Sequence, residues 1–273
     1  MRKKIVQYGV IALVVIIGII ALNTQKEEKP SYQPRDYAEI IESGVLRAVT
    51  EYNAISYHVA DDTLQGFDYE LLHAFAADQK LKLEITPEMS FEQRLKGVTE
   101  GKFDILATGT VITTQSKDTL LFTHPLALSK QVLVQRKQEE GEPDSTYITS
   151  QLDLAHKKLH VIKGSPALLR LHNLMNEIAD TIYIEEVAQY GPEQLLAMVA
   201  GKDIDYAVCD ENIASQLLPR FPNLDINTAI SFTQFYAWGV SKHAPVLLDS
   251  LNLWLDQFSK TKAYRQLQQK YFN

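Results

Sequence analysis

The stretch SFEQRLKGVTEGKFDIL, residues 90–106, contains a helix pattern followed directly by a strand pattern. Ser90 and Gln93 have the spacing of a capping box, so the helix is predicted to begin just after Ser90. Its apolar side chains recur at helical spacing and predict one buried face, formed by Phe91, Leu95 and Val98. Residues 104–106 are predicted to be the next strand. A helix and a strand in such close succession are typical of α/β proteins.

A similar helix and strand are predicted in residues 192–208. Pro192 suits the first turn of a helix, and the pattern EQ-x-L-x-x-V is common to both predicted helices. The two patterns are 101 residues apart in the chain, and Asp104 and Asp205 are separated by the same number of residues. Two amphipathic helices can resemble each other by chance; the alternative is that the chain contains two lobes of related α/β construction.

The rest of the chain also alternates short apolar runs with helical patterns, as α/β layering requires. Residues 45–49 and 81–85 are predicted strands, and residues 66–68 are predicted to open a helix. Two further apolar runs, residues 131–135 and 235–240, are predicted to connect the lobes. The C-terminal stretch is predicted to form two helices, each with one apolar face.

The amino terminus predicts the cellular location. Residues 1–22 combine three basic residues with an almost wholly apolar stretch. This pattern predicts an uncleaved transmembrane anchor, with a cleaved signal peptide as the alternative, and residues 23–36 are predicted to be a solvated linker. Because basic residues stay inside, the rest of the chain is expected at the periplasmic face of the inner membrane or, after signal cleavage, free in the periplasm. No cysteine is present there to carry a lipid.

Composition and charge argue against several classes of function. The 273 residues carry a formal net charge of −7, and an acidic protein repels phosphate backbones, so no nucleic-acid partner is expected. His156 and His160 have a metal-compatible spacing, but two lysines lie between them, and no metal site is predicted. No phosphate loop, dinucleotide fingerprint or nucleophile elbow is present in the sequence, and no cofactor is expected. The single cysteine, Cys209, is predicted to be a buried strand residue.

Small polar residues follow two of the predicted strands. The strand predicted to end at Leu106 is followed by Thr108, Gly109 and Thr110. A second predicted strand, residues 159–162, is followed by a tight turn and Ser165. In open α/β sheets, ligands collect beyond the carboxyl ends of the strands. Free backbone N–H groups at the helix start beside Ser165 can hold a carboxylate, although plain helix capping explains the same residue.

Asp210 is the candidate charged residue. It lies at the end of the predicted strand 206–209, where its carboxylate could pair with a ligand ammonium. The alternative is that Asp210 caps a helix that begins near Glu211. The sequence leaves both interpretations open.

Several motifs, taken in order, resemble those of the family 3 extracellular solute-binding proteins. The order and spacing hold across most of residues 44–273, and the ordered set is more specific than any single motif. The motifs are Gly66–Leu71, Gly101–Asp104, Gly109 with Phe122–Pro125, Asp205–Asp210 and Tyr264–Phe272. Within that group the chain is most similar to the amino-terminal module of the membrane-bound lytic transglycosylases F, on Thr50, Ala54–Tyr57 and Gly66–Leu71.

The resemblance implies an α/β fold of the type II periplasmic-binding-protein class, with two lobes, two hinge strands and a ligand cleft between the lobes. The first lobe would hold residues 37–131 and 232–273, and the second lobe residues 132–231. The transglycosylases continue into a catalytic lytic domain with an essential glutamate. Since this chain ends at Asn273, where the binding module would end, the resemblance implies a sensor without the hydrolytic part.

The resemblance also implies ligand-binding residues, with departures from the family pattern at Ser116, Val111, which replaces the usual hydroxyl residue, and Pro166, which replaces a residue with a hydroxyl and an N–H. Amino-acid binders of the family carry an arginine seven residues after the glycine equivalent to Gly109, and Ser116 occupies that position here. Asp210 matches the carboxylate that holds the ligand amine. The predicted ligand-binding residues are Tyr52, Tyr57, Thr108, Gly109, Thr110, Ser116, Ser165 and Asp210.

The expected function is non-catalytic binding of a small ligand by a membrane-tethered extracytoplasmic sensor. The ligand would be amino acid-like, a peptide or a cell-wall fragment, and the expected partners are the inner membrane and either cell-wall enzymes or an ABC permease. One alternative is the receptor of an amino-acid ABC importer, against which the serine at position 116 argues. The others are a cyclic-acid dehydratase-like enzyme and a partner-binding module whose cleft no longer takes a ligand.

Overall fold

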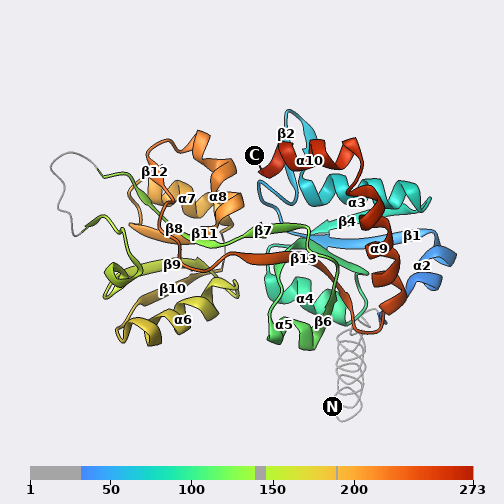
Figure 1. Cartoon of the computed structure of the whole chain (residues 1–273), viewed down its shortest axis with the longest axis horizontal. Coiled ribbons are helices and arrows are strands. Elements are labelled where there is room, and N and C mark those ends of the chain that lie inside the picture. The colour runs from blue at the N-terminus through green and yellow to red at the C-terminus, as the bar shows by residue number, and fades with distance from the viewer. Residues whose placement is uncertain (1–31, 139–145, 189, 273) are drawn as a thin grey trace, which may run out of the picture. The chain divides into compact units, whose positions relative to one another are not determined.

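The computed structural model describes residues 32–138, 146–188 and 190–272, which belong to one compact unit from Pro34 onwards (Figure 1). The predicted anchor, residues 1–22, and the first part of the predicted linker lie outside the described residues. Among the described residues, no helix is both long enough and apolar enough to cross a membrane.

The first sheet contains the two strands that flank the helix Phe91–Thr99 in the chain. Three of its neighbouring strands, β4, β1 and β5, run parallel to one another, whereas β13 runs antiparallel to β5, β6 and β7. The strand order is β4 (Lys82–Pro87), β1 (Val45–Thr50), β5 (Ile105–Val111), β13 (Gln234–Ser241) and β6 (Leu120–Phe122), with β7 (Ala127–Ser129) also paired to β13.

Helices cover both faces of this first sheet (Figure 1). Aromatic and aliphatic side chains such as Phe67, Phe75 and Trp238 are fully or almost fully buried in its main core. The covering helices are α2 (Tyr37–Ser43), α3 (Phe67–Asp78), α4 (Phe91–Thr99), α5 (Thr114–Thr119), α9 (Pro245–Phe258) and α10 (Lys262–Phe272), and a hairpin of β2 (His58–Ala60) and β3 (Thr63–Gln65) precedes α3.

The second sheet has its own two cores. One core lies between the sheet and α6, and the other lies between the opposite face and α7 with α8, as the helices above and below this sheet in Figure 1 indicate. The strand order is β10 (Tyr183–Val187), β9 (Lys158–Ile162), β11 (Tyr206–Asp210), β8 (Gln131–Arg136) and β12 (Leu224–Asp225). The helices are α6 (Ala167–Ile178), α7 (Pro192–Ala200), α8 (Glu211–Leu217) and two short 3₁₀ turns, Gln151–Leu154 and Leu218–Arg220.

Two crossings join the sheets, and they lie side by side. The first passes from β7 to β8 through Lys130, and the second leads from Ser231 into β13. The backbone N–H of Gln131 donates to the hydroxyl of Ser231 (2.9 Å), and the N–H of Ile230 donates to the carbonyl of Gln131 (2.8 Å). The chain therefore has the predicted two-lobed α/β architecture, in which each predicted connecting run is a strand of one sheet. The residue boundaries of the lobes stay a prediction.

Gly66 shows why the helix that opens at residues 66–68 begins where it does. Its φ angle is +144°, and a Cβ at this position would lie 2.3 Å from the carbonyl oxygen of Ser56. No residue with a side chain fits this conformation and this close approach. The turn at Gly66 thus fixes the start of α3 against the loop that contains Ser56.

The cap at Ser90 gives the first testable prediction. The Ser90 hydroxyl accepts a hydrogen bond from the N–H of Gln93 (3.3 Å), which is one half of the predicted capping box. The N–H of Ser90 donates to the Glu88 carboxylate (2.8 Å) instead of to Gln93. We expect Ser90→Ala to lower the free energy of unfolding by about 1 kcal/mol, and Ser90→Gly by only a few tenths. Urea denaturation of both variants measures the difference; equal stability of Ser90→Ala and wild type would contradict the capping role.

Candidate functional site

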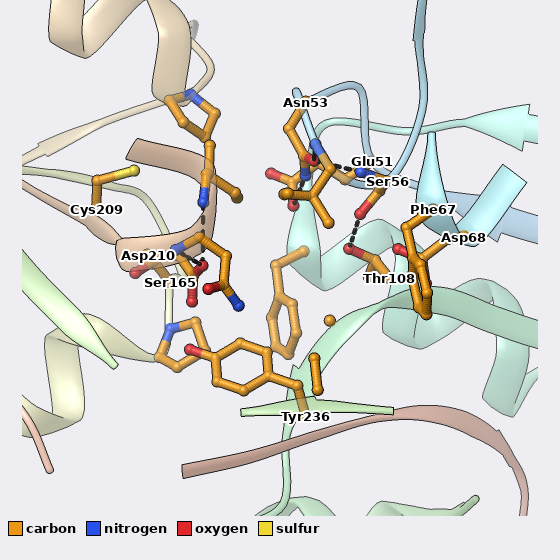
Figure 2. A pocket seen from close by; sticks show the side chains of 18 of the residues that line it. Glu51, Asn53, Ser56, Phe67, Asp68, Thr108, Ser165, Cys209, Asp210 and Tyr236 are labelled. Atoms are coloured by element: carbon orange, nitrogen blue, oxygen red, sulfur yellow. Dashed lines mark hydrogen bonds between the residues drawn. The ribbon is translucent and has the colours of Figure 1, made fainter. Parts of the chain in front are cut away.

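A cavity of about 120 Å³ is lined by residues of both lobes. An engineered protein cavity of about 150 Å³ accommodates benzene, so this volume suits a small organic guest. The chain crosses beside the cavity, because Gln131 of β8 and Tyr236 of β13 both line it. Figure 2 shows Asp210 and Ser165 on one side and Glu51, Asn53 and Ser56 on the other.

The loop after β1 forms part of the first lobe's wall. The Asn53 side-chain oxygen accepts from the backbone N–H groups of Ile55 (2.9 Å) and Ser56 (2.7 Å), which folds the loop into a tight turn. This turn brings the hydroxyl of Ser56 to 3.1 Å from the hydroxyl of Thr108. Thr108 lies within β5 and not after it, because the strand continues past the predicted end at Leu106 to Val111. The loop after β1 and the middle of β5 thus present polar groups to one cavity.

Asp68, in the first turn of α3, is a buried carboxyl group in the same wall. Its Oδ1 accepts a hydrogen bond from the indole N–H of Trp238 (2.6 Å), and only 3 % of the residue is exposed. Burial raises the pKa of Asp68 to about 6, while the hydrogen bonds from Trp238 and Ser56 oppose this shift. Asp68 therefore titrates close to physiological pH.

Asp210 at the end of β11 has one of its two predicted roles in the structure, the cap of α8. Its Oδ1 accepts from the N–H groups of Asn212 (3.0 Å) and Ile213 (3.3 Å) and caps α8. Its Oδ2 is buried and has no hydrogen-bond partner among the described residues. Burial raises the pKa of Asp210, although the nearby hydroxyls of Tyr236 and Ser129 lower it. The capping role and a position in the cavity wall are thus compatible.

Tyr236 and Gly109 are matched in shape. A Cβ at Gly109 would lie 2.8 Å from the Tyr236 ring, so the glycine makes room for this ring. The Tyr236 hydroxyl accepts from the side-chain amide of Gln131 (3.0 Å) across the two lobes. Burial and the neighbouring Asp210 raise the pKa of Tyr236, which keeps this hydroxyl protonated. Tyr236 can therefore donate a hydrogen bond towards Asp210 or a guest.

Arg94 and Glu51 were not predicted as site residues, yet both line the cavity. Arg94 is 4 % exposed, and its Nη2 lies 3.4 Å from Oε2 of Glu51. Burial raises the pKa of Glu51, and the Arg94 charge and the Asn53 side chain lower it. A signal for Arg94 exists in the sequence: it lies three residues after Phe91 and four before Val98, so it shares the buried helix face.

The structure brings together part of the predicted set. Thr108, Gly109, Ser165 and Asp210 line the cavity. Tyr52, Tyr57, Thr110 and Ser116 do not belong to the described lining.

Each of those four side chains has local contacts instead. The Tyr52 and Tyr57 rings meet edge to face (6.4 Å between centroids), and the Thr110 hydroxyl donates to the Thr108 carbonyl (3.2 Å). The Ser116 hydroxyl accepts from the N–H of Thr113 (2.9 Å) within the capping box of α5. The binding roles of all eight predicted residues stay predictions.

Cys209 lies on β11 next to Asp210 and lines the cavity. Burial and the Asp210 charge raise the pKa of its thiol well above its usual value. A thiolate is the nucleophilic form of cysteine. Cys209 is therefore a neutral thiol, as expected for a cysteine that packs in a protein core.

The two lobes touch each other at sites around the cavity. A Cβ at Gly191 of the second lobe would lie 2.9 Å from Cε of Met89 in the first lobe. The side-chain amide of Gln216 on α8 donates to the carbonyl of Tyr271 on α10 (3.0 Å). Such contacts break when lobes rotate apart about a hinge. The described conformation is thus one in which the lobes are in contact.

Comparisons with known proteins agree with this geometry. The family model of the bacterial extracellular solute-binding proteins, family 3, matches residues 46–273. The chain is 28 % identical over 242 residues to a membrane-bound lytic murein transglycosylase F of Photobacterium profundum, covering 87 % of this chain and 45 % of the relative. It is 27 % identical over 261 residues to that of Pseudomonas fluorescens, covering 94 % and 51 %. The chain thus spans about half the length of these curated relatives.

Solved structures show the same fold. An ancestral amino acid-binding protein, a precursor of cyclohexadienyl dehydratase, has a TM-score of 0.75 at 22 % identity, covering 86 % of this chain and 99 % of that one. A substrate-binding protein of an amino acid ABC transporter from Streptococcus pneumoniae, bound to L-arginine, has a TM-score of 0.73 at 22 % identity, covering 86 % and 98 %. These likenesses confirm the type II periplasmic-binding-protein fold predicted from the sequence.

Proposed function

Because the chain belongs to the family 3 bacterial extracellular solute-binding proteins, we propose that it binds a small guest between its lobes, outside the cytoplasm, without breaking a bond in the guest. The observation that carries this proposal is the cavity lined by polar groups from both lobes, among them the side chains of Ser56 and Asp210. Closure of two lobes on a guest buries most of its surface, as binding sites for small molecules require.

A non-catalytic role is the second part of the proposal. A catalytic site needs an acid, a base or a nucleophile poised at its working pH. In the described cavity, Cys209 has a raised thiol pKa, and Asp68, whose pKa is raised to about 6, is engaged by the indole N–H of Trp238. Other polar side chains of the cavity accept hydrogen bonds from backbone N–H groups, as Asn53 and Asp210 do. This arrangement favours holding a guest over transforming it.

Tethering to the membrane is a further part of the proposal, and it rests on the sequence of residues 1–22. A tethered sensor would remain in the membrane fraction after cell breakage and would be released only by detergent. A protein with a cleaved signal would be soluble and would begin after that stretch, which amino-terminal sequencing detects. Cell-wall enzymes or a permease are the proposed partners of such a sensor.

A ligand screen tests the binding proposal. We expect at least one compound in a panel of free amino acids, short peptides and murein fragments to raise the melting temperature in a concentration-dependent manner. Murein fragments belong in the panel because the curated relatives are named murein transglycosylases. A variant of a residue in the cavity wall, Asp210→Asn, is the control, because its stabilisation by the same compound should be reduced or lost. Silence of the whole panel with the wild-type protein would contradict the proposal.

A further inference from the structure

Carboxyl groups of both lobes meet at the cavity. Glu51, in the loop after β1, and Asp68, in the first turn of α3, line it from the first lobe. Asp210, at the end of β11, lines it from the second lobe, and Figure 2 shows Glu51 and Asp210 on opposite sides. Among the described residues of the lining, Arg94 is the only lysine or arginine, and no histidine is present. With the three carboxyl groups ionised, the cavity wall therefore carries three negative charges and one positive charge.

The single positive charge of this wall is held within the first lobe. Nη1 of Arg94 donates to the backbone carbonyls of Glu88 (2.6 Å) and Met89 (2.9 Å), and Nη2 lies 3.4 Å from Oε2 of Glu51. All of these partners belong to the chain between β1 and α4. Arg94 therefore offsets the charge of Glu51, and the other two carboxyl groups have no offsetting cation in the described lining.

Asp68 and Asp210 are held by neutral donors. The Trp238 indole and the Ser56 hydroxyl donate to Asp68, and the hydroxyls of Tyr236 and Ser129 with the N–H groups of Asn212 and Ile213 donate to Asp210. Burial outweighs these donors and raises the pKa of both carboxyl groups, and it raises the pKa of Glu51 as well. The Glu51 charge also raises the pKa of Cys209 in the second lobe, so its field crosses the cavity. Each carboxylate is thus less stable in this arrangement than in water.

Separation of the lobes lowers this cost. The lobes touch beside the cavity, where a Cβ at Gly164 would lie 4.0 Å from Cβ of Phe91. Rotation about the two crossings breaks such a contact and lets water reach the cavity wall. Water stabilises the carboxylates, and distance weakens the repulsion between Glu51 and Asp210. A proton on a carboxyl group removes both effects and therefore favours the arrangement with the lobes in contact.

We propose that the guest-free protein closes its lobes in a proton-linked manner: the closed form takes up protons on the carboxyl groups of Glu51, Asp68 and Asp210, so that a falling pH favours closure. The sign follows from linkage, because the state that binds more protons gains stability as the pH falls. For Asp68 the window lies between its pKa of about 6 in the described form and its ordinary value of 3.8. This inference goes beyond the proposed binding function, since it concerns the protein without a guest.

The experiment measures the distance between the lobes in the full chain, dialysed to remove any small guest. Spin labels are attached to the double variant Lys96→Cys and Asn173→Cys, because both residues are exposed and lie outside the described cavity lining. They lie on α4 and α6, the helices that begin on either side of the contact between Phe91 and Gly164. The thiol of Cys209 is buried and neutral, and unmodified wild type serves to show that it takes up no label. Electron–electron double resonance then gives the distribution of distances.

We expect a short and a long distance whose ratio rises at least about tenfold in favour of the short one between about pH 7.5 and about pH 5, because one pKa unit corresponds to a tenfold change. Glu51→Gln and Asp210→Asn should each raise the short population at about pH 7.5 and flatten its pH dependence. Arg94→Gln should lower that population, because the only offsetting cation is lost. Glu186→Gln is the control: this carboxyl group is exposed on β10, outside the described lining, and the variant should respond as wild type does.

The opposite signs expected for the two charge types separate proton linkage from a general weakening of the fold. A ratio in wild type that does not change with pH overturns the proposal, and so does a response in Glu51→Gln and Asp210→Asn that equals that of wild type. A single distance at every pH shows that the guest-free lobes do not move and also overturns it. If Arg94→Gln fails to fold in a thermal melt, the two carboxyl variants still decide the question. None of these outcomes affects the binding function, which the thermal screen with guests tests separately.

Discussion

The variant Asp210→Asn is expected to bind an amine-bearing guest at least about 30-fold more weakly than wild type while remaining folded. Removal of one partner from a buried charge pair costs about 2–5 kcal/mol of binding free energy, because the other charge is left without compensation. The asparagine oxygen can still accept from the N–H groups of Asn212 and Ile213, so the cap of α8 survives. The loss therefore reports on charge and not on helix stability.

Asp210→Ala is the matched comparison. It removes the same charge and also the cap, which is worth about 1 kcal/mol of folding free energy. Titration calorimetry should give a similar loss of affinity for both variants, whereas urea denaturation should show a lower stability for the alanine variant alone. An Asp210→Asn protein with wild-type affinity would remove Asp210 from the binding site.

The difference in stability between Asp210→Asn and wild type should also depend on pH in a defined direction. Burial raises the pKa of Asp210 in the folded protein, so the folded state holds the proton more firmly than the unfolded state. The carboxylate thus lowers stability at pH values above its folded pKa, and this cost vanishes as the pH falls below its unfolded pKa. The asparagine variant avoids the cost, which is consistent with a charge that is retained for binding.

The elements of the fold were predictable because their signals are local. The strand at residues 45–49 and the helix at 192–200 follow from apolar periodicity and a proline at the first turn, and the structure has β1 at Val45–Thr50 and α7 at Pro192–Ala200. The predicted strand at 206–209 appears as β11, Tyr206–Asp210. Its end position placed Asp210 at the edge of the sheet. Local pattern therefore carried the prediction from element to site at this residue.

The rest of the site depends on contacts between distant segments, which a single sequence does not reveal. Tyr236 lies next to Gly109 because β13 runs antiparallel to β5, and this pairing joins residues far apart in the chain. The spacing of Arg94 places it on the buried face of α4, but a long cationic side chain among apolar residues usually extends its charge into solvent. Its pairing with Glu51 and two backbone carbonyls holds it at the cavity instead.

Ser116 illustrates a local signal that competes with the resemblance. Thr113 and Ser116 have the three-residue spacing of a helix cap, and their reciprocal hydrogen bonds start α5. A hydroxyl engaged in this way replaces the long cation that other members would place there.

Asp68→Asn is expected to stabilise the protein by up to about 3 kcal/mol at about pH 7.5. The pKa of Asp68 rises from 3.8 to about 6 on folding because the carboxyl group is buried. One pKa unit corresponds to about 1.4 kcal/mol, so the ionised form costs about 3 kcal/mol of folding free energy above the folded pKa. An asparagine oxygen can accept from the Trp238 indole in the same way, and the charge is absent.

The pH dependence of this gain follows from the same shift. Between pH 6 and 3.8 the folded protein is protonated at Asp68 while the unfolded chain is still ionised, so wild type becomes more stable as the pH falls through this window. The advantage of Asp68→Asn should therefore shrink through this range and disappear below it. Urea denaturation midpoints at about pH 7.5 and about pH 4 measure the change.

Asp68→Ala separates the charge from the hydrogen bond. Alanine removes the acceptor and leaves the Trp238 indole N–H buried without a partner, which costs about 1–3 kcal/mol at any pH. We expect this variant to be less stable than Asp68→Asn at both pH values. If Asp68→Asn were instead less stable than wild type at about pH 7.5, the donors around Asp68 would have to stabilise its charge, and a carboxylate at this wall would contribute fully to the field that a guest meets.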